Sequence, residues 1–410
     1  MNKNKTALFI VPRSSESWEG SEALWVTIAG WSSAAKQEFG NALVLTTDRI
    51  AEPSEVLNYP LKRKKNEESK KPNKLFGIVP NIFKTLIKDL LLWKSSNNKE
   101  RYNYQIPDLG EVCFVWEHHD IFPGIGYELA QKYNAPFIKY VHAPQVWEAT
   151  KWGVSRPLWG IVLEAIEAKS LKKADVVACV SPKVVEKLVE MGIDSRNILI
   201  SPMAVDPELF ENVDSKQISI QYKLEDKFVI GWTGSFRSFH GLDLLLNVFK
   251  KVTERIDNAR LMLVGDGFEK ASTMKMAKDL NIENLVIFTG RKSFIEIPKY
   301  IDTFDLAIVS ASKRSDFHYS PLKLREYLGA GKATLAPNAG EIPDIFSDDL
   351  HLKLYNVGEI EETANIIINL AHSDEYRKSL AENGKKFVVQ NGTWRVELEK
   401  TLKKIKENSN

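Results

Sequence analysis

Residues 316–344, DFHYSPLKLREYLGAGKATLAPNAGEIPD, change from a polar loop to a short helix and then to a strand. Apolar residues recur at helical spacing in the middle of the stretch: Leu322, Leu324, Tyr327 and Leu328. Pro321 suits the first helical position and Ser320 suits the N-cap, while Gly331 follows the helix end. Residues 333–336 have the composition of a short buried strand. The stretch therefore predicts a loop–helix–strand unit.

The start of this predicted helix is a candidate anion site, because backbone N–H groups at a helix N-terminus attract negative charge. Glu326 lies on the same side as Leu322, within reach of another polar group of the same ligand. A phosphate at the helix end and a ribose at the carboxylate would fit. The pattern S-P-x-K-x-x-E alone leaves open an ordinary capped helix with a solvated Glu326. Residues 329–332, GAGK, lack the earlier glycine and the following Ser or Thr of a Walker loop.

Residues 320–332, followed by Gly-Glu-Ile-Pro at 340–343, resemble the signature of retaining nucleotide-sugar glycosyltransferases of the GT-B fold, family four. The resemblance implies an α/β protein of two Rossmann-like, doubly wound domains facing each other across a cleft that holds the donor. It also implies that the helix start binds the donor diphosphate and that Glu326 binds the ribose. Members carry an acid eight residues before that Glu. Here His318 occupies the position, and Asp316 is the nearest acid upstream.

The resemblance extends to other strand ends. In residues 234–241, GSFRSFHG, members commonly have Arg after the first glycine and Lys before the second. Ser235 and His240 occupy these places, so Arg237 is expected to carry the main charge. His142 matches a histidine that members place near the transferred sugar. We predict catalytic roles for His142, Arg237 and Glu326, and donor contacts for Gly20, Ser21, Gly234, Ser235, His240, Gly267, Arg291, Asp316, His318, Ser320, Pro321, Leu322, Lys323 and Glu341.

Composition is that of a globular protein, with 27% charged and 43% hydrophobic residues. At 410 residues, two domains are expected, at 1–205 and 206–385, with a C-terminal helix at 386–410 packing back toward the first. A net charge of +2 gives no overall attraction to nucleic acid. Cys113 and Cys179 lie in apolar runs and predict a reducing compartment. With no signal-peptide pattern and no spanning run, we expect a cytoplasmic protein.

Residues 75–93 keep apolar residues at helical spacing and carry flanking lysines, after a Lys-rich stretch at 62–74. Such a basic amphipathic helix is typical of a membrane-surface contact, here at 62–94, and equally of a helix packed on the first domain's sheet. The aromatic residues that follow His142 leave the same question open. The expected partners are thus a nucleotide-sugar donor, a glycan or lipid-linked acceptor and a possible membrane surface.

No cofactor or metal site is predicted, because the sequence has neither Asp-x-Asp nor His-Glu-x-x-His. Gly265-Asp266-Gly267 lacks a third glycine, which counts against a dehydrogenase. Two alternatives to a transferase remain. One is a nucleotide-sugar 2-epimerase on the same fold, and the other is a nucleotide-binding module that has lost catalysis.

Overall fold

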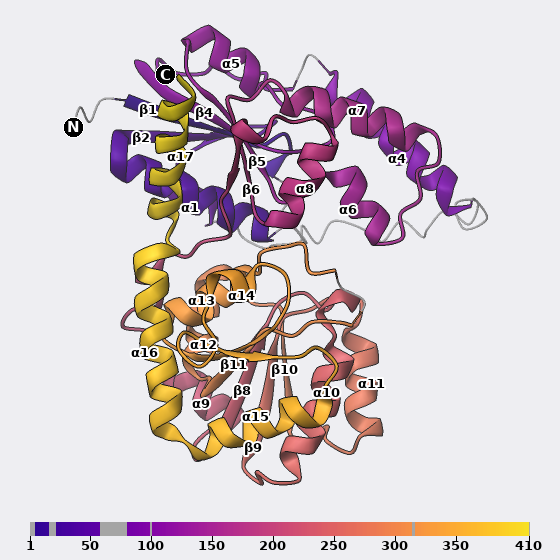
Figure 1. Cartoon of the computed structure of the whole chain (residues 1–410), viewed down its shortest axis with the longest axis vertical. Coiled ribbons are helices and arrows are strands. Elements are labelled where there is room, and N and C mark those ends of the chain that lie inside the picture. The colour runs from indigo at the N-terminus through magenta and orange to yellow at the C-terminus, as the bar shows by residue number, and fades with distance from the viewer. Residues whose placement is uncertain (1–4, 16–21, 58–79, 99–100, 314–315, 410) are drawn as a thin grey trace. The chain divides into compact units, whose positions relative to one another are not determined.

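The structure, a computed structural model, describes residues 5–15, 22–57, 80–98, 101–313 and 316–409 (Figure 1). The chain forms two compact units, of which the first comprises Met1–Pro202 and Glu397–Asn410 and the second Met203–Val396. The polypeptide therefore leaves the first unit once and returns to it near its C-terminal end. The predicted Gly20 and Ser21 lie outside the described residues.

The first unit is built on a seven-stranded sheet in the order β3-β2-β1-β4-β5-β6-β7, in which only β3 is antiparallel to its neighbour. Its central strands are almost wholly buried, as expected for parallel strands with helices on both faces. The strands are β1 Lys5–Ile10, β2 Gly40–Leu45, β3 Ile50–Ala51, β4 Glu111–His118, β5 Phe137–Val141, β6 Val176–Cys179 and β7 Ile198–Ile200. The helices are α1 Glu22–Phe39, α2 Pro53–Val56, α4 Asn81–Ser96, α5 Gly126–Tyr133, α6 Gln145–Lys151, α7 Trp159–Leu171 and α8 Pro182–Glu190.

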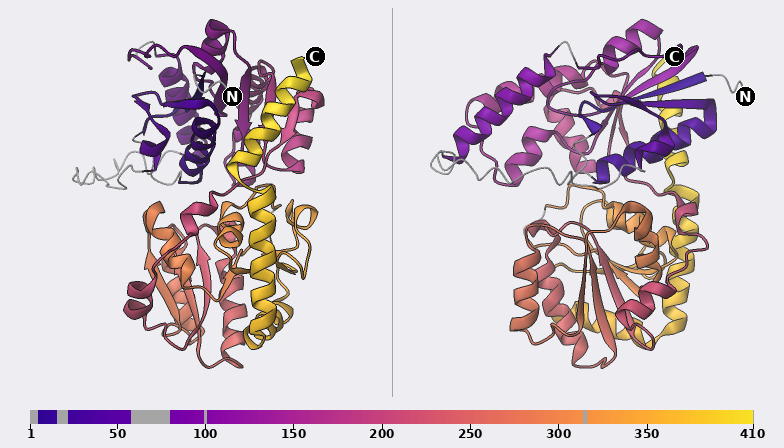
Figure 2. Two further views of the ribbon diagram at one scale, coloured as in Figure 1. Left: turned by 90° about the vertical axis from the view of Figure 1, so that its left-hand side faces the viewer. Right: turned by 180° about the vertical axis from the view of Figure 1, so that it is seen from behind.

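The second unit has a six-stranded, all-parallel sheet in the order β10-β9-β8-β11-β12-β13. Its strands are β8 Phe228–Thr233, β9 Ala259–Val264, β10 Val286–Gly290, β11 Leu306–Ile308, β12 Ala333–Pro337 and β13 Lys353–Tyr355. Its helices are α9 Lys216–Tyr222, α10 Leu242–Thr253, α11 Lys270–Asp279, α12 Ile297–Asp302, α13 Leu322–Gly329, α14 Ile342–Ile345, α15 Ile360–His372 and α16 Asp374–Asn391. Figure 2 shows helices on both sides of the strands.

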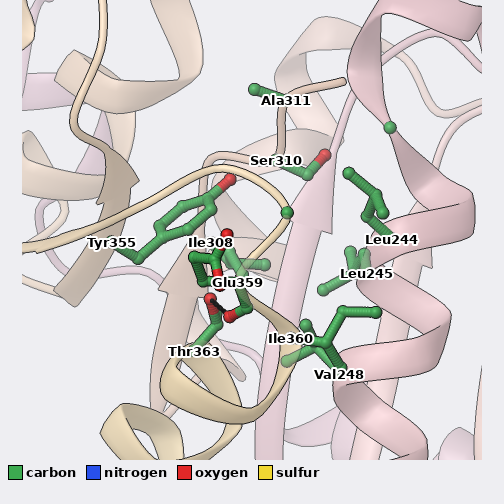
Figure 3. A pocket seen from close by; sticks show the side chains of 12 residues that line it. Leu244, Leu245, Val248, Ile308, Ser310, Ala311, Tyr355, Glu359, Ile360 and Thr363 are labelled. Carbon is green, nitrogen blue, oxygen red and sulfur yellow. Dashed lines mark hydrogen bonds between the residues drawn. The ribbon is translucent and has the colours of Figure 1, made fainter. Parts of the chain in front are cut away.

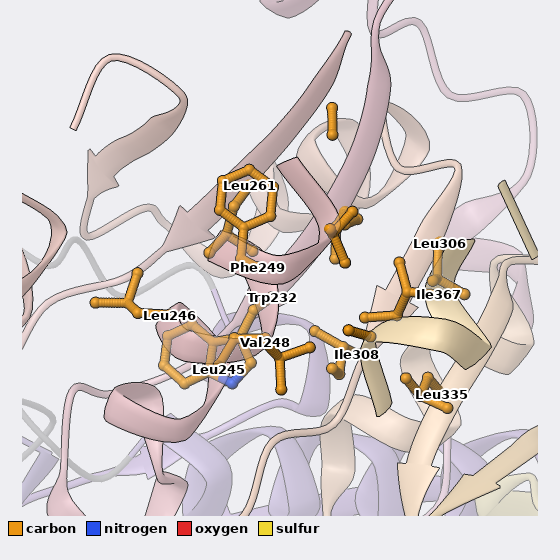
Figure 4. Packing of buried hydrophobic residues seen from close by; sticks show 14 of the residues in the cluster. Trp232, Leu245, Leu246, Val248, Phe249, Leu261, Leu306, Ile308, Leu335 and Ile367 are labelled. Atoms are coloured by element: carbon orange, nitrogen blue, oxygen red, sulfur yellow. The ribbon is translucent and has the colours of Figure 1, made fainter. Parts of the chain in front are cut away.

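Alternation along β8 divides the core of the second unit between the two faces of its sheet. Ile230 and Trp232 pack with α10 and α15 on one face, including Phe249 (Figure 4). Val229 packs on the other face with residues of α12 and α13, including Tyr327. Both units therefore have the doubly wound α/β architecture predicted from the sequence.

The last helix, α17 (Trp394–Ser409), begins in the second unit and ends in the first. In the first unit, Ser201 Oγ donates to Glu397 Oε2 at 2.8 Å, and Asn408 Nδ2 donates to the carbonyl of Asp175 at 2.9 Å. The C-terminal helix predicted over residues 386–410 corresponds to α17, which begins at Trp394 after α16 ends at Asn391.

Helix α4 does not bury its apolar stripe in the sheet. Phe83, Leu90 and Leu91 are 56%, 54% and 62% exposed, whereas Asp89 is buried. The alternative in which the stripe packs on the sheet is therefore wrong for the described residues 81–93. Residues 75–79 and the Lys-rich stretch lie outside the described residues. No helix in the described part of the chain is long and apolar enough to span a membrane.

Each sheet has one point at which its strand order reverses, between β1 and β4 in the first unit and between β8 and β11 in the second. Loops at the carboxyl ends of such neighbouring strands diverge and leave room for a ligand. The residues that follow these four strands are therefore the first place to look for a functional site.

Candidate functional site

In the second unit, two glycine-containing turns follow β8 and β9 and pack on each other. The N–H of Gly234 donates to the carbonyl of Val264 at 2.9 Å. A Cβ atom on Gly265 would lie 1.8 Å from the Gly234 carbonyl oxygen, and one on Gly267 would lie 2.7 Å from the backbone of Phe236. Close backbone packing thus explains both glycines, and the predicted contact between Gly267 and a donor stays a prediction.

Helix α13 follows β11 and starts one residue later than predicted. Pro321 is the N-cap, with φ −75° and ψ 112°, and Leu322 is the first helical residue. The prediction that Ser320 caps the helix is wrong, because its hydroxyl instead accepts a hydrogen bond from the N–H of Met203 at 3.1 Å. No side chain in the described structure caps α13. The Leu324 N–H donates to the carbonyl of Pro321 at 3.1 Å, and the N–H groups of Leu322 and Lys323 are left for a ligand or solvent.

The side chain of Tyr327 holds α13 against the end of β8. Its hydroxyl oxygen accepts a hydrogen bond from the Thr233 N–H at 2.7 Å and lies 3.0 Å from the Thr233 hydroxyl. All these groups are buried. Sequence reasoning missed this contact, because nothing in the spacing of Tyr327 and Thr233 indicates that they meet.

Lys323 projects from the first turn of α13 toward the same strand end. Its Nζ lies 4.2 Å from the centre of the Trp232 ring, and a Cβ on Gly234 would approach Nζ to 2.7 Å. This ammonium group is buried and has no hydrogen-bond partner among the described residues. Burial lowers the pKa of Lys323 to about 7, against a smaller opposing effect of Glu326. Gly234 therefore provides space for a cation that lacks an anion.

Glu326 lies one turn further along α13 and is 6% exposed. Burial raises the pKa of Glu326 to about 7, and the nearby Lys323 partly opposes that shift. Within the described residues, Glu326 and Lys323 interact electrostatically without forming a direct ion pair. A ligand offering both an anion and hydroxyl groups would satisfy both side chains.

His240 and Arg237 belong to the loop after β8. The His240 ring is buried against Trp232 and Phe239, with centroid distances of 5.5 and 4.2 Å. Burial, with smaller effects of Lys323 and Arg237, lowers the pKa of His240 well below its ordinary value. His240 is therefore a neutral imidazole at neutral pH, and its predicted contact with the donor stays a prediction. Arg237 is half-buried and, like the half-buried Ser235, precedes the short helix Ser238–His240.

The loop before α13 places an acid beside His318 despite its shifted register. His318 Nδ1 lies 2.6 Å from Asp316 Oδ1, and His318 is buried. Glu341, by contrast, is 1% exposed and forms an ion pair with Arg325 at 2.7 Å. This pair explains the burial of both charges, and a donor contact of Glu341 stays a prediction. Arg291 is exposed just after β10.

In the first unit, His142 directly follows β5. Its ring lies edge-on to those of His118 and Tyr140, at 5.1 and 5.4 Å between centroids, and Nε2 lies 3.4 Å from the Thr27 hydroxyl. Burial is the main cause that lowers the pKa of His142 to about 4. His142 is thus a neutral imidazole at neutral pH, suited to hydrogen bonding.

Figure 3 shows a small cavity at the carboxyl end of β11, between α10 and α15. Its lining includes Leu244, Ser310 and Tyr355 but none of the predicted site residues. The cavity is therefore separate from the cluster at Lys323. The described residues contain no group of three or more His, Cys, Asp or Glu side chains placed to hold a metal ion.

Two family models match this chain. Residues 214–387 match the family model of glycosyl transferases group 1, and residues 114–209 match that of glycosyltransferase family 4. The Bacillus anthracis N-acetyl-alpha-D-glucosaminyl L-malate synthase is 24% identical over 221 residues, 54% of this chain and 56% of that protein. The Salmonella typhimurium lipopolysaccharide 1,2-N-acetylglucosaminetransferase is 30% identical over 179 residues, 42% of this chain and 46% of that protein. The chain thus spans about half the length of the curated relatives it matches.

Among solved structures, that of Anabaena HepE in complex with UDP superposes with a TM-score of 0.62 at 15% identity, covering 98% of this chain and 100% of that one. At this identity the likeness concerns the fold. The two family models together match more than half of the chain and meet near the start of the second unit. The chain belongs to the group 1 glycosyltransferases and has the GT-B fold.

Proposed function

We propose that this chain transfers a sugar from a nucleoside-diphosphate sugar to a hydroxyl group of a glycan or lipid-linked acceptor. The observation that carries the proposal is the position of Lys323 and Glu326, two residues of α13 that lie near each other without an ion pair. Both charges are buried, and the uncapped first turn of α13 adjoins them. A diphosphate would neutralise Lys323 and bind the helix N–H groups, and the hydroxyl groups of a ribose would donate hydrogen bonds to Glu326.

The departing diphosphate requires donors that are in place before its charge develops. Lys323, Arg237 and the α13 amides supply them, so we propose a reaction that needs no metal ion. The bond from the anomeric carbon to the phosphate oxygen breaks, while the acceptor oxygen bonds to the same face of the sugar. The acceptor proton passes to the leaving phosphate. This route retains the anomeric configuration, as the family resemblance implies.

His142 acts in this proposal on the transferred sugar, as a neutral hydrogen-bonding group. Its lowered pKa keeps the imidazole neutral at neutral pH, so it does not repel a developing oxocarbenium ion as a protonated ring would. UDP-N-acetylglucosamine is the first donor to test, because the Bacillus and Salmonella relatives are named for an N-acetylglucosaminyl product and for N-acetylglucosamine transfer. GDP-sugars are the second class.

The test is a thermal-shift panel of UDP- and GDP-sugars, followed by assays of donor hydrolysis and sugar transfer with and without EDTA. We expect one nucleotide class to raise the melting temperature and its sugar to be transferred in EDTA. Product formed from the donor alone, as a 2-epimer, would favour the epimerase. Tight nucleotide binding without turnover under any acceptor would favour a non-catalytic module. Binding of neither class would overturn the proposal.

A further inference from the structure

Helix α4 is attached to the first unit by its polar side. Asp89 is 3% exposed, and its carboxylate accepts hydrogen bonds from Arg156 Nε at 2.8 Å and Nη2 at 3.1 Å, and from Trp159 Nε1 at 2.9 Å. Arg156 and Trp159 lie just before and at the start of α7. The single acid of α4 is thus turned inward and neutralised. Figure 1 shows α4 lying alongside α7.

The apolar side of α4 therefore faces solvent. Phe83, Ile87, Leu90 and Leu91 recur at helical spacing and are all exposed, and Leu92 and Trp93 extend the apolar surface. Soluble proteins rarely expose contiguous apolar patches of this kind unless a partner covers them. Helix α4 is thus amphipathic, but its orientation is the reverse of the usual one. Its polar residue Asp89 faces the protein and its apolar side chains face solvent.

The start of α7 adds more apolar side chains to the same surface. Leu158, Ile161 and Val162 are 87%, 76% and 60% exposed, and Trp152 at the end of α6 is 49% exposed. We call these residues, together with the exposed apolar residues of α4, the α4–α7 patch. It arises from two helices that the Asp89 hydrogen bonds hold together.

Leu158 is presented at an energetic cost. Its φ of 65° and ψ of −62° are those of a strained γ-turn, closed by a hydrogen bond from the Trp159 N–H to the Pro157 carbonyl at 2.8 Å. Such a conformation persists where the surrounding structure enforces it, and it clusters at functional positions. Here it holds a leucine side chain almost fully in solvent, where the side chain contributes nothing to the core.

The charges around the patch indicate what covers it. Lys84, Lys88 and Lys94 are the other charged residues of α4, and no ion pair with a described acid neutralises them. A surface of leucine, phenylalanine and tryptophan edged by lysines complements the boundary between acyl chains and anionic headgroups. A protein surface of ordinary composition carries both acids and bases. The charged residues that α4 exposes are all lysines, which suits an anionic membrane better.

We propose that the α4–α7 patch binds the surface of an anionic lipid bilayer, with the apolar side chains entering the headgroup boundary and the lysines contacting lipid phosphates. Binding is peripheral and reversible. It depends on salt through the lysines and on apolar area through the two helices. This inference does not rest on the proposed transferase activity.

The test is co-sedimentation of the full chain with vesicles of phosphatidylcholine alone or mixed with phosphatidylglycerol. We expect at least tenfold stronger binding to the anionic vesicles, weakened by added salt. The double variant Leu91→Glu/Ile161→Glu should lose at least tenfold of that binding. The matched control Ile220→Glu/Ile295→Glu replaces two exposed isoleucines of the second unit and should bind as the parent does. Equal loss in the control, or no vesicle binding by the parent, would overturn the proposal.

A second variant keeps the test independent of folding defects. Leu158→Gly relieves the positive φ and removes an exposed side chain, so it should raise the melting temperature by about 2–4 °C while lowering vesicle binding. Higher stability with unchanged vesicle binding would contradict a role of Leu158. Light scattering tests the alternative that a second copy of the chain covers the patch. That alternative would hold if the parent formed a dimer without binding vesicles and Leu91→Glu/Ile161→Glu dissociated the dimer.

Discussion

The strand-order reversals of the two sheets differ in how they treat charge. In the first unit the charged side chains near the strand ends have polar partners: Arg13 Nε lies 2.7 Å from Asp120 Oδ2, and the Glu167 carboxylate lies 2.9 Å from His119 Nε2. In the second unit, Lys323 and Glu326 are buried without such partners. These charges of the first unit thus have partners within that unit, whereas the second unit retains two charges that a ligand can satisfy.

This difference suggests separate roles for the two units, one in positioning the reacting groups and one in binding an anion. Unpaired buried charges cost stability, and they persist where binding repays the cost. Paired charges with neutral histidines maintain geometry and offer hydrogen bonds without strong attraction for an anion. We therefore expect variants of the first unit to change turnover and variants of the second to change nucleotide affinity.

The largest expected effect tests the first half of this comparison. His142→Ala should lower kcat by about 100-fold or more, because a positioned hydrogen-bonding group is lost from the transition state. UDP affinity should stay unchanged, since Lys323 and Glu326 remain. Steady-state kinetics and calorimetry measure the two quantities, with the exposed His372→Ala as the control. Unchanged turnover would remove His142 from the mechanism.

The second half is tested by Lys323→Met, which keeps an unbranched side chain only one atom shorter over Trp232 and removes the charge. Nucleotide affinity should fall by roughly 10- to 100-fold, the contribution of one or two charge-assisted hydrogen bonds. Calorimetry with UDP and GDP measures this loss. Lys278→Met, an exposed lysine on α11, serves as the matched control. If the two lysine variants bind alike, the pairing of Lys323 with a phosphate is wrong.

The pH dependence of stability sharpens the same comparison. Lys323 titrates near pH 7 when folded and near 10.5 when unfolded, so the unfolded chain binds the extra proton in between and stability increases with pH across that window. Glu326 titrates near 7 when folded and near 4.5 when unfolded, so stability decreases as pH rises across that lower window. Together the two groups lower stability most near neutral pH.

The single variants should therefore respond to pH in opposite ways. Lys323→Met should raise the melting temperature by about 2–4 °C at neutral pH, with the gain shrinking toward about pH 10. The gain from Glu326→Gln should instead grow as pH rises from about 5 to about 7. Melting temperatures measured from about pH 5 to about pH 10 check both predictions. If the gains of the two variants changed with pH in the same direction, the opposite effects assigned to Lys323 and Glu326 would be wrong.

The smallest effect concerns the contact that fixes α13 to the sheet. Tyr327→Phe should destabilise the protein by about 1–2 kcal/mol, because the buried Thr233 N–H loses its acceptor. Tyr133→Phe in the first unit should change stability by less than about 0.5 kcal/mol. Denaturant titration measures both free energies of unfolding. A neutral Tyr327→Phe would mean that packing alone positions α13.

Local patterns predicted the elements of the second unit well, because their signals are confined to a few neighbouring residues. The strand predicted at residues 333–336 is β12, and the helix predicted before it is α13. The resemblance likewise singled out Lys323 and Glu326. The sequence could not predict that these two charges are buried without an ion-pair partner. Their burial depends on Trp232 and Gly234, which belong to another element.

The incorrect predictions have the same origin. Ser320 has the ordinary composition of an N-cap, but its hydroxyl is engaged by Met203, which lies far from it in sequence. The stripe of α4 has the ordinary pattern of a buried face. However, Asp89 accepts hydrogen bonds from Arg156 and Trp159, and these contacts orient the polar side of the helix inward. Periodicity identifies the two faces of a helix, and long-range polar contacts decide which one is inside.

The return of α17 to the first unit bears on how the polypeptide is made. During synthesis, residues 203–396 emerge as an uninterrupted segment and can condense around their own sheet as soon as they leave the ribosome. The earlier-made segment must wait for residues 397–409 before Ser201 and Asp175 gain their partners. The part translated first is thus finished last, and premature termination upstream of Glu397 would leave it incomplete while sparing the second unit.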